Sequence, residues 1–152
     1  MVIAVAEVKG QAFRWNLSSS VGSGQINRLD DVELVRFGYN CLKQNKKFPP
    51  SAALLPALRA MKTFGEFDQD LADVIVAHQK DRGGTQDGIV SVANVTFTST
   101  NRELYDRKHS WIIIALCNNM IDVAGDVYPR VDKHPESGPE ISRSVKSIFG
   151  IK

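Results

Sequence analysis

The sequence predicts a mainly helical α+β fold, a compact helical bundle with an N-terminal β-hairpin and one further strand. Apolar residues recur at the 3.6-residue spacing of an amphipathic helix in several separate segments of the chain. Residues 2–17 are instead rich in β-branched and aromatic residues, a composition typical of strands. The length of 152 residues suits one domain, 1–152, and is too short for two ordinary domains.

The first part of the chain divides into a hairpin, a loop and a helix. Residues 2–17 supply both strands of the hairpin, and residues 18–27 form a polar, glycine-rich loop. A helix is expected over about residues 32–44. Asp30 or Asp31 is its expected N-terminal cap, because a short carboxylate accepts hydrogen bonds from the free amide groups there. The apolar face of this helix carries Leu34, Phe37, Gly38 and Cys41.

Two more helices are expected between residues 52 and 80. The first covers residues 52–62, after Pro49 and Pro50 have ended the preceding helix. The second covers residues 68–80, with aspartates in its first turn and basic residues near its end, as the helix dipole favours. Gly83 and Gly84 can adopt the left-handed conformation that closes many helices.

The last third of the chain combines a strand, a helix and a tail. Residues 88–98 alternate enough to indicate a strand. The most apolar helix follows and is expected to end at Pro129. Its beginning, residues 111–117, is also rich in β-branched residues, so a strand remains an alternative there, although the periodicity favours a helix. Residues 130–152 contain a short amphipathic segment and are expected to dock loosely or to serve as a contact for a partner.

Charge and targeting signals restrict the classes of partner. The net charge is only +2 and no basic cluster is evident, which argues against nucleic-acid binding. The longest apolar run, residues 111–117, is far too short to span a membrane. The N-terminus does not have the pattern of a signal peptide. We therefore expect the protein to be synthesised in the cytoplasm. A function in the periplasm or cell envelope would require export by a dedicated machine.

No group of residues indicates catalysis, a metal site or a cofactor. The three histidines do not have zinc-ligand spacing. Cys41 and Cys117 lie in apolar stretches, which favours buried free thiols over a disulfide. A nucleophilic pair of Cys41 and His78 is conceivable, but the sequence shows neither a lowered thiol pKa nor contact with a base. The protein is therefore not expected to be an enzyme.

Two segments together resemble the peptidoglycan-binding-like domain family, a small helical module. The first is SVGSGQINRLDDVELVRFGYN, residues 20–40, and the second is FGEFDQDLADVIVAHQKDRGGTQDGIV, residues 64–90. The second is similar to the last helix of the module, with its Gln79, a glycine-containing break and an Asp-Gly turn at Asp87. His78 stands where the family commonly has phenylalanine. The resemblance covers about residues 18–92.

The resemblance implies a non-catalytic binding module of the bacterial envelope, or of a secretion or phage-like apparatus, that recognises peptidoglycan. A binding groove needs a few polar and aromatic groups on a rigid frame. The side chains expected to converge beside the turn are Tyr39, His78, Gln79, Arg82, Thr85 and Asp87. The family's Gly-Pro-x-Thr after the Asp-Gly turn is replaced by SVANVT, residues 91–96. An alternative is therefore a protein-interaction factor, such as an immunity protein, adaptor or assembly factor, that keeps the fold without binding the wall.

Overall fold

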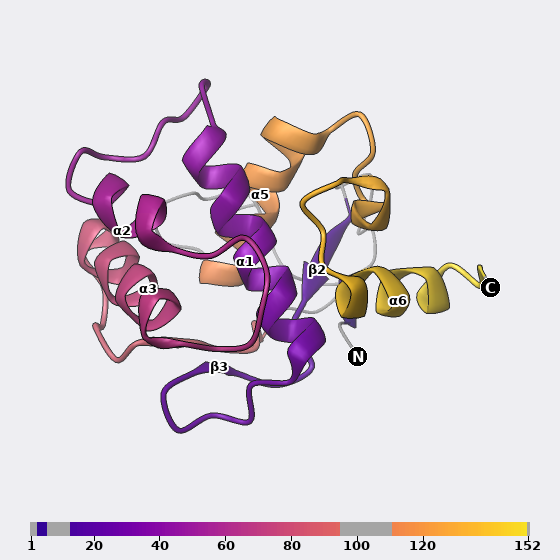
Figure 1. Ribbon diagram of the computed structural model, residues 1–152, viewed down its shortest axis with the longest axis horizontal. Helices are drawn as coiled ribbons and strands as arrows, with labels where there is room; N and C mark the ends of the chain where they lie inside the picture. The colour runs from indigo at the N-terminus through magenta and orange to yellow at the C-terminus, as the bar shows by residue number, and fades with distance from the viewer. Residues whose placement is uncertain (1–2, 6–12, 95–110, 152) are drawn as a thin grey trace.

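The computed structural model describes residues 3–5, 13–94 and 111–151, and the fold is mainly helical α+β, as the sequence predicts (Figure 1). The helices are α1 (Leu29–Gln44), α2 (Leu55–Ala60), α3 (Gln69–Arg82), α5 (Ile112–Ala124) and α6 (Pro139–Ile148), with a 3-10 turn η1 (Val131–Lys133) before α6. The strands are β1 (Ile3–Val5), β2 (Arg14–Asn16), β3 (Val21–Gly22) and β4 (Ile89–Val90). Within these described ranges, no helix combines the length and the apolar composition that crossing a bilayer requires.

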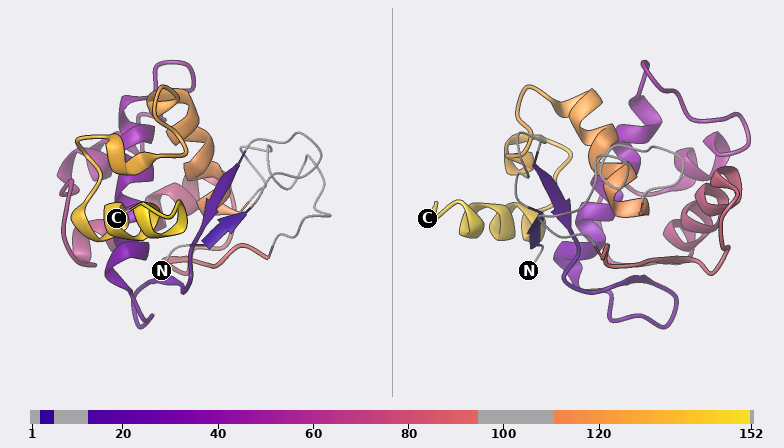
Figure 2. Two further views of the ribbon diagram at one scale, coloured as in Figure 1. Left: turned by 90° about the vertical axis from the view of Figure 1, so that its right-hand side faces the viewer. Right: turned by 180° about the vertical axis from the view of Figure 1, so that it is seen from behind.

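Helix α1 is the centre of the bundle. It contacts α2 on one side and α5 and α6 on the other, and α2 packs in turn on α3 (Figures 1 and 2). Every residue of α1 from Asp30 to Leu42 is buried, although the sequence predicts only one apolar face. Gly38 lies where α5 crosses, and a Cβ atom there would fall 2.6 Å from Cβ of Leu116. The glycine therefore allows the two helices to approach closely.

The buried polar residues of α1 fix the loops around the helix. Arg36 is fully buried, and its guanidinium donates to the backbone carbonyls of Lys62, Gly65 and Glu66. The same group lies 3.3 Å from the carboxylate of Asp68. A buried charge needs such partners to offset the loss of hydration. Arg36 thus holds the segment that leads into α3.

The predicted N-terminal hairpin is confirmed, because β1 and β2 pair antiparallel with Ala4 opposite Trp15. A second antiparallel pair joins β3 to β4. The strand expected over residues 88–98 covers only Ile89–Val90 in the described part of the chain, and residues 95–98 lie outside it. The side-chain amide of Asn16 donates to the C=O of Ala93 and accepts from its N–H. At Ala93 this side chain makes the two hydrogen bonds that a neighbouring strand would otherwise make.

The ends of α3 agree with the sequence, whereas those of α1, α2 and α5 differ; α2 covers Leu55–Ala60 and not residues 52–62. Asp68 caps α3 by accepting a hydrogen bond from the N–H of Leu71, and Gly83 closes it with φ of +76°. The capping expected for α1 is wrong, because this helix begins at Leu29 and Arg28 occupies the cap position. Asp31 instead accepts hydrogen bonds from the backbone and hydroxyl groups of two serines, Ser18 and Ser19. Helix α5 ends at Ala124, before the expected stop at Pro129.

The C-terminal third packs against α1. Residues 112–117 are helical within α5, as their periodicity favours. The tail expected to dock loosely, residues 130–152, buries Ile141 and Val145 of α6 completely in the hydrophobic core. The core therefore extends from β2 through α1 and α5 to α6.

Candidate functional site

Gln79 and Asp87 hold the turn that follows α3. The Gln79 amide donates to Oδ1 of Asp87 at 2.8 Å and to the carbonyl of Ile89 at 3.1 Å. Its carbonyl accepts from the N–H of Gly88 at 2.8 Å, and Oδ1 of Asp87 also accepts from the N–H of Ile89. Both predicted site residues therefore bind the protein's own backbone and each other.

Tyr39 and His78 form a buried pair that joins α1 to α3. The Tyr39 hydroxyl lies 3.0 Å from Nδ1 of His78, and the two rings meet edge to face. Burial raises the pKa of Tyr39 and lowers the pKa of His78 to about 3, with the nearby Arg82 charge adding to the second effect. Both side chains are therefore neutral at physiological pH.

A pocket of about 250 Å³ opens where the C-terminal half of α1, the C-terminal end of α3 and α5 come together. Its lining contains two of the six predicted site residues, His78 and Arg82. Tyr39 lies beneath His78 in the core, while Thr85 and Asp87 are exposed on the turn and do not line the pocket. The other lining residues are Leu42, Phe48, Asp81, Ala115 and Asn119.

Phe48 is held at the rim of this pocket by the segment around Asn45. The side-chain amide of buried Asn45 donates to Oδ1 of Asn119 at 2.8 Å and to a carboxylate oxygen of Asp122 at 3.1 Å. Its carbonyl accepts hydrogen bonds from the N–H groups of Lys47 and Phe48. The Phe48 side chain remains 44% exposed. The pocket thus combines an aromatic rim with polar groups on a rigid frame.

Sequence reasoning did not identify Phe48 or Asn119 as site residues. Phe48 stands in a loop between a helix end and Pro49, and Asn119 is a polar residue in the most apolar helix. A buried polar residue in an apolar helix indicates a specific hydrogen-bonding partner. That signal points to Asn119, but the partner Asn45 becomes evident only in the fold.

Neither cysteine has the lowered pKa of a nucleophilic thiol. Burial raises the pKa of the Cys41 thiol to about 12 and that of Cys117 to about 11, so both remain protonated. Both are free, buried thiols, as the sequence favours. In the described ranges, no three His, Cys, Asp or Glu side chains gather into a group that could hold a metal ion. His109 lies outside the described residues.

Comparison with protein-family models, with curated proteins and with solved structures found no match to this chain. The resemblance to the peptidoglycan-binding-like family therefore rests on the two quoted segments alone.

Proposed function

We propose that this protein is a non-catalytic binding module that recognises peptidoglycan through the pocket between α1, α3 and α5. The observation that carries the proposal is the convergence on one hollow of Phe48, His78, Arg82 and Asn119 from three different elements. Two of these residues belong to the segment that resembles the family. Of the other four predicted residues, Gln79 and Asp87 support the turn that follows α3.

The chemistry of the pocket suits a fragment of cell wall. A half-exposed aromatic ring such as Phe48 offers an apolar surface to the face of a sugar ring. Arg82 supplies a guanidinium for a carboxylate of the glycan or its peptide. His78 is neutral, so its ring has one N–H donor and one acceptor nitrogen, and Nδ1 is engaged by the Tyr39 hydroxyl.

Co-sedimentation with insoluble peptidoglycan sacculi tests the proposal. We expect saturable binding by the wild-type protein and a loss of about tenfold or more in affinity for Phe48→Ala and for Arg82→Gln. Phe64→Ala and Arg59→Gln are matched controls, because Phe64 is 46% exposed and Arg59 is also exposed, and neither lines the pocket. The proposal would be contradicted if the wild type showed no saturable binding. It would also be contradicted if a control variant lost as much affinity as its matched pocket variant.

A further inference from the structure

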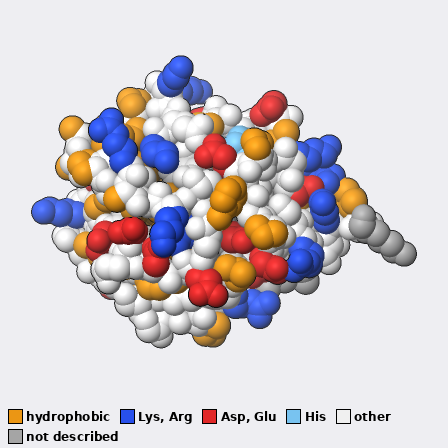
Figure 3. Space-filling model, viewed as in Figure 1, with side chains coloured by type: hydrophobic (Ala, Val, Ile, Leu, Met, Phe, Trp, Pro, Cys, Tyr) orange, Lys and Arg blue, Asp and Glu red, His pale blue; other side chains and the backbone are white. Residues whose placement is uncertain are grey.

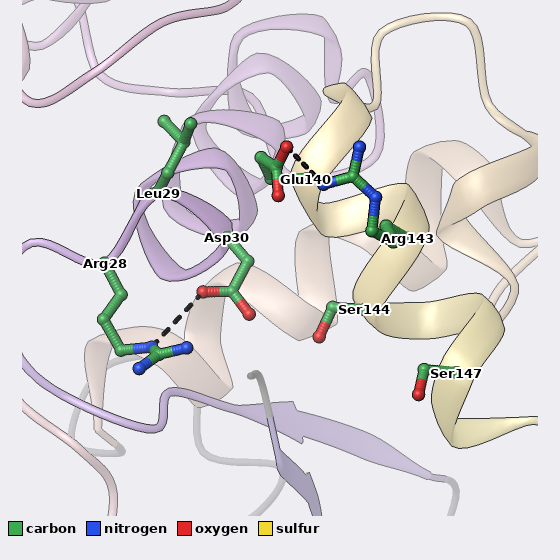
Figure 4. A pocket seen from close by; sticks show the side chains of 7 residues that line it. All are labelled: Arg28, Leu29, Asp30, Glu140, Arg143, Ser144 and Ser147. Atoms are coloured by element: carbon green, nitrogen blue, oxygen red, sulfur yellow. Dashed lines mark hydrogen bonds and ion pairs between the residues drawn. The ribbon is translucent and has the colours of Figure 1, made fainter.

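A pocket of about 440 Å³ lies between the first residues of α1 and α6, and its charged groups already have partners. Nε of Arg28 lies 3.7 Å from Oδ1 of Asp30, and the guanidinium of Arg143 contacts the carboxylate of Glu140 (Figure 4). Acidic and basic side chains are also interspersed over the face seen in Figure 3. Neither feature selects a class of ligand, whereas the turn that follows α3 combines two groups that can react with each other.

This turn contains the one Asp-Gly pair of the sequence, Asp87 and Gly88. Glycine has no side chain to shield its backbone nitrogen, so that nitrogen can attack the neighbouring carboxyl group. The nitrogen of Gly88 would form a bond to Cγ of Asp87, and the amide proton would leave with the carboxyl hydroxyl as water. The product is a five-membered succinimide. Its hydrolysis takes up one water and yields either aspartate or isoaspartate, so no other reactant is needed.

Hydrogen bonds hold both of these groups in the folded protein. The N–H of Gly88 donates to Oε1 of Gln79 at 2.8 Å. Oδ1 of Asp87 accepts from Nε2 of Gln79 at 2.8 Å and from the N–H of Ile89 at 3.0 Å. Ring closure has to break these bonds, because the carboxyl group must turn toward Gly88 and the nitrogen must lose its proton.

Gln79 can restrain the turn because its own position is fixed. It lies in the last turn of α3, and its side chain is buried. Its Nε2 also donates to the carbonyl of Ile89, the first residue of β4, at 3.1 Å. Gly88 is buried and Asp87 is exposed, so water reaches the carboxylate while the attacking nitrogen is covered.

We propose that Asp87 and Gly88 form a site of succinimide and isoaspartate formation, and that Gln79 prevents this reaction in the folded protein. Local opening of the turn then limits the rate of modification. The proposal does not depend on peptidoglycan binding, because none of these three residues lines the pocket between α1, α3 and α5.

Isoaspartate at position 87 would change the path of the chain into β4. In isoaspartate the backbone runs through the side-chain carbon, which adds one methylene group. Strand β4 begins two residues later and pairs with β3, where Gly22 lies opposite Ile89. A Cβ atom at Gly22 would fall 2.4 Å from the carbonyl oxygen of Gly88, so the two segments are tightly packed. The modification should therefore disturb the pairing of β3 with β4.

Incubation of the full chain at physiological temperature and pH tests the proposal, with isoaspartate at position 87 measured by mass spectrometry. We expect the folded wild type to form isoaspartate about tenfold or more slowly than the same chain unfolded in guanidinium chloride, because folding holds the reacting groups out of position. Gln79→Ala, with circular dichroism confirming that it is folded, should react about fivefold or more faster than the folded wild type.

Two controls separate the local effect of Gln79 from a general loss of stability. Gln86→Ala removes an exposed glutamine from the same turn and should leave the rate unchanged. Glu33→Ala removes a hydrogen bond to Ile141, far along the chain from the turn, and should also lower the stability of the protein. It should nevertheless accelerate isoaspartate formation less than Gln79→Ala does.

A measurement on the wild type alone does not depend on any variant. At low concentrations of denaturant, the rate of isoaspartate formation should rise in parallel with the hydrogen-exchange rate of the Gly88 amide, because both need the turn to open.

Three results would overturn the proposal. The first is an equal rate of modification in the folded and unfolded wild type. The second is a rate in folded Gln79→Ala that equals the wild-type rate or is matched by Glu33→Ala. The third is a rate of modification that does not follow the exchange of the Gly88 amide.

Discussion

Glu33 of α1 caps the N-terminus of α6, because its carboxylate accepts a 2.7 Å hydrogen bond from the N–H of Ile141. Helix α6 has glycine, Gly138, at its own cap position and no side-chain cap there. A Cβ atom at Gly138 would overlap the Glu33 carboxylate. A residue more than one hundred positions away therefore provides the cap that local sequence normally supplies.

Replacing Glu33 should destabilise the protein by removing this cap. We expect Glu33→Ala to lower the free energy of unfolding by about 1–3 kcal/mol, because the amide groups at the start of α6 lose their acceptor. Glu33→Gln keeps an acceptor oxygen and should cost less. Urea denaturation measures both changes. Equal stability of Glu33→Ala and the wild type would show that the contact contributes nothing.

Enlarging Gly38 should disturb the crossing of α1 and α5. We expect Gly38→Ala to cost about 1–3 kcal/mol, since the added methyl would meet Leu116 at 2.6 Å in a close-packed interior. Gly84→Ala is the matched control, because a Cβ atom there would have no heavy atom within 4 Å. A thermal or urea unfolding experiment should separate the two variants. Comparable stability would mean that the helices can shift apart without cost.

The burial of His78 should make stability depend on pH. Its pKa falls to about 3 in the folded protein because burial disfavours the charged ring, whereas an unfolded histidine titrates near 6.5. The unfolded state therefore binds the proton first as the pH falls. Stability is fully present above about pH 6.5 and is lost toward pH 3, by at most about 1.4 kcal/mol for each pH unit.

The double variant Tyr39→Phe with His78→Phe isolates this effect, because it removes the titrating ring and leaves no buried hydroxyl without a partner. Its stability should change less than that of the wild type between pH 7 and about pH 5 in urea denaturation. Parallel pH profiles for the two proteins would contradict the assignment of the pH dependence to His78.

Replacing Gln79 should lower the stability of the protein and should affect ligand binding only indirectly. We expect Gln79→Ala to cost about 1–3 kcal/mol, because Asp87, Gly88 and Ile89 lose hydrogen bonds to a buried side chain. Hydrogen exchange should accelerate in residues 83–90. Gln86→Ala, an exposed glutamine in the same turn, is the control. If hydrogen exchange in these residues were unchanged in Gln79→Ala, other contacts would be sufficient to hold the turn, and the prediction would be wrong.

Periodicity and capping chemistry predict the helices, since these signals lie within a few residues of the elements that they describe. Aspartates are expected in the first turn of α3, and Asp68 is found as its cap, while Gly83 closes the helix as predicted. The apolar stripe of α5 outweighs its β-branched residues. The predicted start of α1 is wrong because the carboxylate of Asp31 makes a tertiary contact in place of capping the helix. Asp31 accepts hydrogen bonds from Ser18 and Ser19 in the loop before the helix, and not from the amide groups of the helix end.

The candidate site could be predicted only in part. The segment after residue 64 predicts His78 and Arg82, and both line one pocket. Phe48 and Asn119 come from other elements, and the Asn45 hydrogen bond that brings them together is a property of the fold. The burial of Tyr39 behind His78 also follows from helix packing rather than from local pattern.

The most direct test of the proposed function is an amide NMR titration with a soluble muropeptide, a disaccharide of N-acetylglucosamine and N-acetylmuramic acid with its attached tripeptide. The account predicts saturable shifts centred on Phe48, His78, Arg82 and Asn119, which Phe48→Ala weakens and Phe64→Ala does not. No saturable shift at millimolar muropeptide, or shifts confined to the pocket between α1 and α6, would contradict it.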